Sequence, residues 1–465
     1  MNLICSNTAL RKRIVTIAQL GLTVIIFVGY TQTLAGQAAE NHSVIAIGLS
    51  EVDQKLASNA ASRSTEILTL GPGSIHGLRT TLPVEAGTKE FSNARAAIQS
   101  LANNSATSSR RFLVTDLGSL GGTESFAYAL NFFGQIVGSS RTTGDASTHS
   151  FLYRHGVITD LAPLNSGDLQ TVGPTSINDA GQVASGVISN GVYVPAILDS
   201  KTGSLSLIGT LGGVSFGLNG VATSVNDIGH AAGYSYINSD TRHAFLYRNG
   251  AMNDIGSFGG DSVAFAVNDF DVVVGSATDA SAGGAARAFR YANGVMTAIG
   301  PATESNGRDV NFFGQVVGEY FNPDQSAFRG FLYSNGNFTD FGSGPDTTPF
   351  GINNLGLIVG SFLRPFESVC DGMPCIGFKQ HAFLVENQNI VDLNDLVPRQ
   401  TSLELQWAFD VNDLGQIVGY GQVNDKFRAF LLTPAISTIQ CKNKGWQLFG
   451  FKNKGQCVRF VNQSN

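Results

Sequence analysis

The sequence NFFGQIVGSS runs from Asn131 to Ser140, and NFFGQVVGEY runs from Asn311 to Tyr320. Two stretches so alike indicate an internal repeat, which has to be recognised before domains are counted from length. Relatives of this stretch occur seven times, and they begin at Asn131, Asn178, Asn226, Asn268, Asn311, Asn353 and Asn412. The copies are 42 to 59 residues apart, which predicts one supersecondary unit per copy.

Two further motifs follow each copy in a set order. The second motif is HSFLY from His149, PAIL from Pro195, HAFLY from His243, RAFRY from Arg287, RGFLY from Arg329, HAFL from His381 and RAFL from Arg428. The third is of the type TDLG, and it usually contains an aspartate, as at Asp160, Asp254, Asp340 and Asp392. Each unit therefore has four short apolar segments separated by turns, which predicts a four-stranded antiparallel sheet.

The turn residues agree with this prediction. Asn-Gly pairs such as Asn249-Gly250 fit two-residue hairpin turns, in which both residues have positive φ. The Asn that opens each repeat is expected to tolerate left-handed backbone and to hydrogen-bond its own turn. The Gly three residues later would supply positive φ. The last Gly of the motif would let neighbouring backbones approach closely.

The ends of the repeat predict a closed ring. About 42 residues and four strands per unit is the size of a propeller blade, and such a sheet must stack on its neighbours. The seventh unit stops after its third strand, RAFLLTP, whereas FLVTDLGSLGG, from Phe112 to Gly122, precedes the first unit and matches a fourth strand. We therefore predict an all-β, seven-bladed β-propeller over residues 111–434, closed by the N-terminal strand.

These motifs resemble the repeats of the bacterial extracellular HAF repeat family, through the HAFLY, TDLG, LGG and Asn-x-x-Gly elements. The resemblance covers residues 111–434, about 70% of the chain. It implies export and tandem repeats, and it carries over no catalytic residues. The unit at Asn178 departs most from the pattern, since Pro195 replaces the His and Leu207 replaces the Asp.

Residues 1–39 have the features of an export signal. The basic residues Arg11 to Arg13 precede an apolar run from Ile14 to Tyr30, and small residues suited to a signal peptidase follow. The alternative is an uncleaved membrane anchor, because a run of about 17 residues is near the shortest that spans a bilayer. No second run of that length follows, so we expect a secreted or cell-surface protein with no membrane span after signal removal.

The remaining composition limits the class of partner. Residues 40–110 are small, polar and aperiodic, as in ASNAASRST, which predicts a flexible leader or linker. Removing residues 1–39, with three basic and no acidic residues, would change the net charge from −6 to −9. An acidic chain with no long basic block argues against nucleic acid as a partner. We expect a monomer.

Four cysteines follow the signal: Cys370, Cys375, Cys441 and Cys457. An even number in an exported chain suggests two disulfides, and the spacing favours Cys370–Cys375 and Cys441–Cys457 among the three possible connectivities. The alternative is a zinc site, which needs four converging ligands, and no CxxC spacing or neighbouring His supports one. We therefore predict neither a metal nor another cofactor.

Residues 435–465 form a separate tail. The segment CKNKGWQLFGFKNKGQCVRF, from Cys441 to Phe460, has five basic residues, no acidic residue and interleaved aromatic residues. It resembles Cys-flanked terminal motifs of other secreted bacterial proteins. We predict a disulfide hairpin that docks onto an anionic cell-wall polymer, and the alternative is a small cap or spacer.

Strand order predicts where binding residues lie. The Asn-x-x-Gly and Asn-Gly turns share one end of the blades, and the variable loops share the other, where binding residues tend to lie. The longest loop, residues 361–380, contains Cys370 and Cys375, and a bridge between them would reduce the ordering cost of binding. The candidate ligand-binding residues are Tyr320, Asn322, Asp324, Arg364, Phe366 and Asp371. The alternative is that these are ordinary solvated loop residues.

Catalytic signatures such as GxSxG, HExxH and the P-loop do not occur in the sequence. His149, His243 and His381 share one repeat position that carries Arg in three other units. We interpret them as polar anchors, paired with the Asp of the TDLG motif, because a metal site or catalytic base needs groups that converge.

The leading hypothesis is therefore a secreted or cell-surface scaffold that binds an extracellular glycan, polymer or protein through its variable loops. One alternative is a purely structural surface protein. The other is a secreted hydrolase or lyase acting on polysaccharide, which needs paired carboxylates. Its acids would be sought at Asp279, Asp324 and Asp371.

Overall fold

The computed structural model describes residues 110–161, 170–189, 191–341, 346–370, 373–399, 401–449 and 451–462. It also describes four earlier strands, β1 (Lys12–Ile17), β2 (Leu22–Gly29), β3 (His42–Gly48) and β4 (Val84–Glu85). β1, β2 and β3 form an antiparallel sheet in a first compact unit, Met1–Ile75, and a second unit comprises His76–Asn465. Apart from these strands and Arg110, the predicted signal and leader lie outside the described residues.

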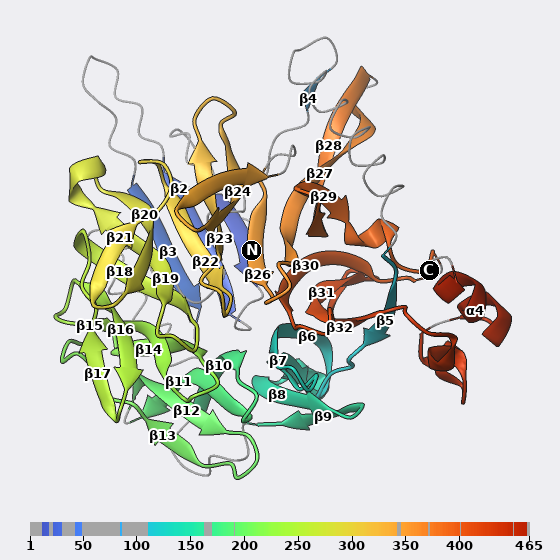
Figure 1. Ribbon diagram of the computed structural model, residues 1–465, viewed down its shortest axis with the longest axis horizontal. Helices are drawn as coiled ribbons and strands as arrows, with labels where there is room; N and C mark the ends of the chain where they lie inside the picture. Colours follow the sequence, from blue (N-terminus) through green and yellow to red (C-terminus); the bar gives the residue numbers. More distant parts are fainter. Residues whose placement is uncertain are drawn as a thin grey trace. The chain divides into compact units, whose positions relative to one another are not determined.

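The second unit contains a seven-bladed β-propeller, as predicted, and each blade is a four-stranded antiparallel sheet (Figure 1). Within a blade the strands are ordered from the central channel outward, and we call them strands A to D. Strands A of neighbouring blades contact one another around the channel.

The first three blades are β6 (Gly121–Leu130), β7 (Ile136–Thr142), β8 (Thr148–Arg154) and β9 (Val157–Asp160); β10 (Gln170–Ile177), β11 (Gln182–Ser189), β12 (Val192–Asp199) and β13 (Leu205–Leu207); and β14 (Gly220–Val225), β15 (Ala231–Tyr236), β16 (Arg242–Arg248) and β17 (Ala251–Asp254). The next three are β18 (Gly259–Val267), β19 (Val273–Asp279), β20 (Ala285–Ala292) and β21 (Val295–Ala298); β22 (Ser305–Val310), β23 (Val316–Asn322), β24 (Ala327–Ser334) and β25 (Asn337–Phe341); and β26 (Thr348–Ile352), β27 (Ile358–Cys370), β28 (Met373–Glu386) and β29 (Asn389–Asp392). Three short 3₁₀ helices, η3 (Thr143–Asp145), η5 (Ala280–Ala282) and η6 (Leu393–Asp395), lie in the connections.

The seventh blade is built from both ends of the propeller. Its first three strands are β30 (Glu404–Val411), β31 (Ile417–Val423) and β32 (Lys426–Pro434), and its outer strand is β5 (Phe112–Asp116). β5 pairs antiparallel with β32, where Leu432 lies opposite Val114, and both side chains are buried. This pairing confirms the predicted closure of the ring by the N-terminal strand.

The repeat motifs meet at one contact between strands B and C. Gly138 of β7 lies opposite Phe151 of β8, which is fully buried. A side chain at Gly138 would collide with the ring of Phe151 and with the carbonyl of Phe126 in strand A. The same pair recurs as Gly233–Phe245, Gly275–Phe289, Gly318–Phe331, Gly360–Phe383 and Gly419–Phe430. The predicted close approach of backbones is confirmed, and the buried Phe ring is a second reason for the Gly.

The Asn that opens each repeat is buried and joins neighbouring blades. Asn131 Oδ1 accepts the amide of Gln135, and Asn131 Nδ2 donates to the carbonyl of Asn178 in the next blade at 3.0 Å. The same inter-blade bond continues around the ring until Asn412 donates to the carbonyl of Asn131 at 3.1 Å. The intermediate bonds run from Asn178 to Asn226, Asn226 to Asn268, Asn268 to Asn311, Asn311 to Asn353 and Asn353 to Asn412. We call this closed set of bonds the asparagine ring.

The backbone of this turn differs from the prediction in one respect. All seven Asn residues are described, and none has positive φ. Gly134 instead has a φ of 70°, and its amide donates to the carbonyl of Asn131. In the fourth blade Asp271 takes the Gly position with a φ of 58°. Gly therefore supplies the left-handed conformation as predicted, whereas the Asn acts through its side-chain hydrogen bonds.

The strand order places the connections on two faces. The A–B and C–D connections lie at one end of each blade, which we call the turn face. The B–C connections and the links between blades lie at the other end, which we call the loop face. β32 ends at the turn face, where a side chain on Gly415 would lie 3.3 Å from Pro434, so the C-terminal tail begins there.

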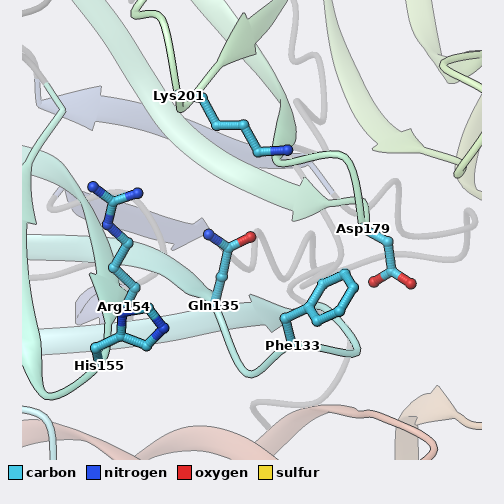
Figure 2. A pocket seen from close by; sticks show the side chains of 6 residues that line it. All are labelled: Phe133, Gln135, Arg154, His155, Asp179 and Lys201. Carbon is cyan, nitrogen blue, oxygen red and sulfur yellow. The ribbon is translucent and has the colours of Figure 1, made fainter.

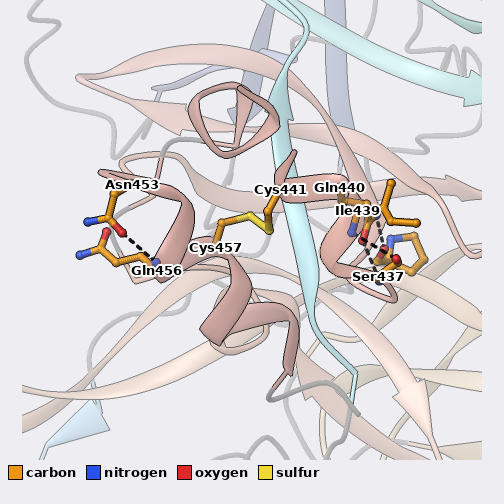
Figure 3. The surroundings of a disulfide bond; sticks show 8 residues. Ser437, Ile439, Gln440, Cys441, Asn453, Gln456 and Cys457 are labelled. Carbon is orange, nitrogen blue, oxygen red and sulfur yellow. Dashed lines mark hydrogen bonds between the residues drawn. A yellow bond between two sulfur atoms is a disulfide. The ribbon is translucent and has the colours of Figure 1, made fainter. Parts of the chain in front are cut away.

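The C-terminal tail packs against β5. Its elements are η7 (Thr438–Cys441), α3 (Gly445–Leu448) and α4 (Lys454–Asn462). The Cys441–Cys457 disulfide lies among them, and both cysteines are buried with Leu113 of β5 (Figure 3). The disulfide pairing is confirmed, but the predicted hairpin is wrong. The segment is helical, and Ser437 and Gln440 cap its first turn reciprocally.

Candidate functional site

The sixth blade carries a long hairpin at the loop face. β27 begins at the same repeat position as β19 of the fourth blade but has 13 residues instead of 7. The extra length corresponds to roughly 20 Å of strand. Pairing with β28 continues to Cys370 opposite Met373, so the segment predicted as a long loop is mostly a two-stranded arm (Figure 1). β4 pairs with β28 along the outer part of this arm.

The tip of the arm is closed by the Cys370–Cys375 disulfide, which confirms the second predicted pairing. Three large apolar side chains near the tip are exposed: Phe366 by 38%, Val369 by 71% and Met373 by 56%. A stiff arm with an apolar tip loses little conformational entropy when it binds. The arm is therefore the part of the loop face best suited to contact a partner. Asp371, predicted at this tip, lies outside the described residues.

The base of the arm is held by a network of charged groups. Arg364 donates to Asp392 and, at 3.2 Å, to Asp395, while the ring nitrogens of His381 lie 2.6 Å from Asp392 and 3.0 Å from Glu404. Burial acts to raise the pKa of Asp392, but His381 and Arg364 outweigh it and hold this pKa low. Burial acts to lower the pKa of His381, but the two carboxylates raise it. Because Arg364 is engaged by two acids, the structure gives it a role in holding the arm.

The predicted residues of the fifth blade form a separate group. Tyr320 donates to Asp340 at 2.9 Å, and the Oδ1 of Asn322 accepts the amide of Asp324 at 3.0 Å. Asp324 is exposed in the connection between β23 and β24. The described candidates therefore divide into two groups on neighbouring blades.

The polar anchors predicted from the second and third motifs are confirmed in five blades. The pairs are His149–Asp160 at 2.7 Å, His243–Asp254 at 2.8 Å, Arg329–Asp340 at 2.7 Å, His381–Asp392 at 2.6 Å and Arg428–Asp116 at 3.2 Å. In the fourth blade Ala298 replaces the Asp, and Arg287 pairs with Asp279 instead. Each pair joins neighbouring strands within one blade, so the pairs are distributed around the ring and do not converge on one ligand.

Of the three acids at which the carboxylates of a hydrolase would be sought, Asp279 and Asp324 lie in neighbouring blades and Asp371 lies outside the described residues. Hydrogen bonds from Ser281 and Arg287 lower the pKa of Asp279. An aspartate held this way stays ionised and is unsuited to act as a general acid. Asp324 lies in the next blade.

The turn face carries a set of exposed apolar side chains. The third residues of the seven Asn-x-x-Gly turns are Phe133, Ala180, Ile228, Phe270, Phe313, Leu355 and Leu414, and the six large ones are 54–78% exposed. In two turns the second residue, Phe132 or Phe312, is apolar as well. We call these eight large side chains the apolar crown. The sequence does contain a signal for the crown, because central turn residues are usually polar and these are large and apolar. It was missed because the Asn and Gly of the motif account for the turn, whatever residues lie between them.

The second residue of the other turns is polar. These residues are Asp179, Asp227, Asp269, Asn354 and Asp413, and each accepts the amide of the equivalent residue in the preceding blade at 2.8 to 2.9 Å. We call the four aspartates the acid ring. Burial raises the pKa of Asp179 against the effect of the Phe132 amide, and the charges of Asp227, Asp269 and Asp413 raise it further. The turns connect the channel-lining strands to strands B, so the four aspartates, in the second, third, fourth and seventh blades, lie at the mouth of the channel.

A shallow pocket of about 270 Å³ lies on the turn face between the first and second blades (Figure 2). It is lined by Phe133, Gln135, Arg154, His155, Asp179 and Lys201, so it includes one crown residue and one member of the acid ring. Small-molecule sites usually enclose roughly 300–1,000 Å³. The pocket therefore suits a side chain of a partner better than a cofactor.

Two more carboxylates line the channel below the turn face. Asp309 of β22 and Asp410 of β30 each accept a main-chain amide of the next blade, at 2.8 and 2.9 Å. Burial raises the pKa of Asp309 to about 6 and that of Asp410 to about 7, and the charge of Asp309 contributes to the second shift. Each side chain keeps some solvent contact, but the surrounding protein dominates its environment. Their direct role is to join blades.

Three broader features bear on the kind of site and on the compartment. Among the described residues, no three His, Cys, Asp or Glu side chains lie together in a way that could hold a metal ion. Within the same part of the chain, no helix is long and apolar enough to cross a membrane. The two disulfides fit an oxidising compartment.

No protein-family model and no curated protein matches the chain. Among solved structures, it is similar to TolB from Acinetobacter baumannii, with 14% identity and a TM-score of 0.37 over 79% of this chain and 81% of that one. It is also similar to the β-propeller domain of the Trilobed protease from Pyrococcus furiosus, with 10% identity and a TM-score of 0.39 over 67% of this chain and 95% of that one. Likenesses this distant carry no conclusion about activity, ligand or partner.

Proposed function

We propose that the protein is an exported binding scaffold that holds an extracellular protein partner on its loop face, with the arm of the sixth blade as the main contact. The observation that carries this proposal is the arm. It has six more residues than β19, it is closed by a disulfide, and it exposes Phe366, Val369 and Met373 near its tip. Protein interfaces typically contain such apolar anchors on a rigid support.

A protein is favoured over a glycan by the chemistry of the tip. Sugars are usually held by flat aromatic faces and by polar groups that are free to bind them. Val369 and Met373 are aliphatic, and Arg364 is already paired with two acids. Tyr320, Asn322 and Asp324 on the fifth blade are proposed as secondary contacts, and a glycan or polymer remains the alternative partner.

The export part of the proposal is supported by the composition of residues 1–39 and by the two disulfides. The resemblance of the motifs to the HAF repeat family has the same implication. A polysaccharide hydrolase is less favoured because Asp279 is neutralised by Arg287.

The test places a photo-crosslinking amino acid at Met373 of the full chain and exposes cells that export it to light. The matched control places the same group at Val295, which is also an exposed apolar residue but lies beside a C–D turn at the turn face. We expect a discrete protein adduct from Met373 that is absent from Val295. The adduct should weaken strongly in a Val369→Ser background, since that change removes a neighbouring apolar contact.

A second experiment uses cell-wall and extracellular polysaccharides as probes. It records, in the same samples, how much protein is retained on each polysaccharide and how much product is released. Retention on a polysaccharide, with no adduct from Met373, would replace the protein partner by a glycan. Release of product that is lost in Asp324→Asn would overturn the scaffold proposal in favour of an enzyme. Equal adducts from Met373 and Val295 would remove the arm as the site of contact.

A further inference from the structure

The apolar crown on the turn face is not required by the fold. The asparagine ring, with Gly at the fourth turn position in six blades and Asp271 in the fourth blade, holds the backbone of these turns. The second blade has Asp179 and Ala180 at the two central positions, yet the amide of Gly181 donates to the carbonyl of Asn178 at 3.0 Å, as in the first blade. Small or polar side chains therefore suffice for the turn, and the large apolar ones need another reason.

The crown residues pack against one another only in part, and they remain largely exposed to solvent. The rings of Phe270 and Phe312 have centroids 4.8 Å apart, and those of Phe132 and Phe133 are 5.6 Å apart, both in edge-on geometry. Phe133 and Phe313 nevertheless remain 68% exposed. Large apolar side chains therefore face solvent at the same position of six turns, and exposed apolar patches often mark interaction sites.

The acid ring supplies four negative charges to this surface, and Arg154 and Lys201 lie beside Asp179 at the pocket. None of the four aspartates of the acid ring belongs to an ion pair within the described residues, whereas the neighbouring Asp271 pairs with His230 and Arg248. Asp179, Asp227 and Asp269 each use one oxygen to accept one amide, so further acceptor positions stay available. Four like charges around one mouth favour a cation that neutralises them.

We infer that the apolar crown and the acid ring together form a second docking surface, which binds a protein segment carrying a Lys or Arg flanked by large apolar side chains. The cationic group lies at the acid ring, and its neighbours pack on crown residues such as Phe133, Phe270 and Phe313. The 270 Å³ pocket beside Phe133 accommodates one further side chain of the segment. This site is independent of the arm, which is on the opposite face.

Other occupants fit the charge less well. An anionic lipid surface or a nucleic acid would be repelled by the acid ring. A second copy of this chain, docked turn face to turn face, would bring two acid rings together. A basic and apolar peptide segment is the partner that satisfies both features of the surface.

The experiment selects a phage-displayed library of random peptides on the immobilised full chain and then measures the best binder by fluorescence anisotropy. We expect enrichment of peptides with Lys or Arg between apolar residues. Affinity for the selected peptide should fall about tenfold or more in Phe133→Ser/Phe313→Ser and in Asp179→Asn/Asp227→Asn, because both kinds of contact are central. Added salt should weaken the second contribution and leave the first.

Two control variants test whether peptide binding depends on the turn face in particular. Phe216→Ser removes a phenylalanine that is 78% exposed on a loop-face link, and Val369→Ser alters the arm. Both variants should bind the selected peptide like the unmodified chain. All substituted side chains on the crown are exposed, so the thermal midpoint should stay unchanged and report intact folding.

Three results would overturn the inference. One is selection of acidic peptides, or of peptides that bind the crown variant and the acid-ring variant as well as they bind the unmodified chain. Another is binding to anionic phospholipid vesicles that disappears in the crown variants. A third is a concentration-dependent dimer in sedimentation velocity that the crown variants abolish, which would identify the crown as a contact between copies of this chain.

Discussion

The turn face and the loop face of the propeller are built from the same repeat, but they differ in what varies. On the loop face the backbone varies, and the sixth blade extends β27 and β28 into an arm while the second strands of other blades stop earlier. On the turn face the backbone is nearly constant, and the side chains at two central turn positions vary between aspartate and large apolar residues. A propeller can therefore present a distinctive surface either through one exceptional loop or through a repeated position.

The two faces also differ in how they contribute to stability. Below the turn face, the buried asparagine ring joins every blade to the next. At the loop face, half-exposed ion pairs such as Arg428–Asp116 join strands within one blade. Substitutions of similar chemistry on the two faces should therefore have effects of different size.

The largest expected difference is between two asparagines. Asn178→Ala removes a donor to Asn226 and an acceptor for Gln182, and it leaves buried main-chain groups unsatisfied. We expect a loss of about 4 kcal/mol in the free energy of unfolding. Asn238 accepts two amides in an exposed loop-face turn, and Asn238→Ala should cost less than about 1 kcal/mol. Urea unfolding of both variants measures the difference, and equal losses would contradict the asymmetry.

The two disulfides provide the next comparison. Cys441 and Cys457 are separated by 16 residues, and Cys441→Ser/Cys457→Ser should destabilise the tail on β5 by about 3 kcal/mol. Cys370 and Cys375 are separated by 5, and their replacement should cost about 2 kcal/mol, confined to the arm. Limited proteolysis with mass spectrometry should show early cleavage in the tail of the first variant and in the arm of the second. Cleavage between propeller blades in either variant would show that these modules are not local.

The channel acids predict an unusual pH dependence. Because the pKa of Asp410 is raised to about 7 in the folded chain, the folded state binds a proton that the unfolded state has released above about pH 4. Stability therefore falls as pH rises from 5 towards 7, by up to about 1.4 kcal/mol per pH unit for one proton. Asp410→Asn keeps an acceptor for the amide of Leu130 and should flatten this slope. The test is urea unfolding at several pH values.

Comparing the pH dependence of the free energy of unfolding of Asp410→Asn with that of the unmodified chain separates the contribution of Asp410 from that of titrating groups on the loop face. The pKa of His381 is raised in the folded chain, so its contribution is present below about pH 6.5 and is also lost as pH rises through the folded value. That contribution is the same in both proteins and cancels. A variant with the full slope would show that the channel acids do not titrate in this range.

The smallest expected effect is at a loop-face ion pair. Arg428 lies 3.2 Å from Asp116, and the Asp116 side chain is 47% exposed. Arg428→Ala should cost less than about 1 kcal/mol, and the loss should shrink further in salt, because solvent screens such pairs. A loss as large as that of Asn178→Ala would remove the proposed difference between the two faces.

Features that depend on near neighbours were predictable. Asn249-Gly250 was assigned to a hairpin turn from its residue types, and both residues have positive φ, 53° and 77°. The disulfides were predictable because each pair is close in sequence. The strand FLVTD was recognised as an orphan fourth strand because its motif occurs in other units, and it pairs with β32.

The strands of the arm and the helices of the tail were not predicted, although both disulfides were, because tertiary contacts rather than local propensity stabilise them. Pro365 and Pro374 lie within β27 and β28, beyond the positions where β26 and β29 pair, and an edge position of a strand tolerates a missing amide. In the tail, α3 and α4 are too short to be stable by propensity. A disulfide and packing on Leu113 hold them.

The repeat, its turns and its strands follow from residues close together in the chain, where propensity and alternation act. The docking surface proposed on the turn face depends on closure of the ring, because the asparagine ring joins residues 42 to 59 positions apart and finally Asn412 to Asn131 across 281 positions. Only then do seven separate turns meet around one mouth, so that isolated apolar residues become a crown and separate aspartates become one charged ring. Each turn can be predicted from its own residues, whereas the surface formed by the apolar crown and the acid ring exists only once the blades are assembled into a ring.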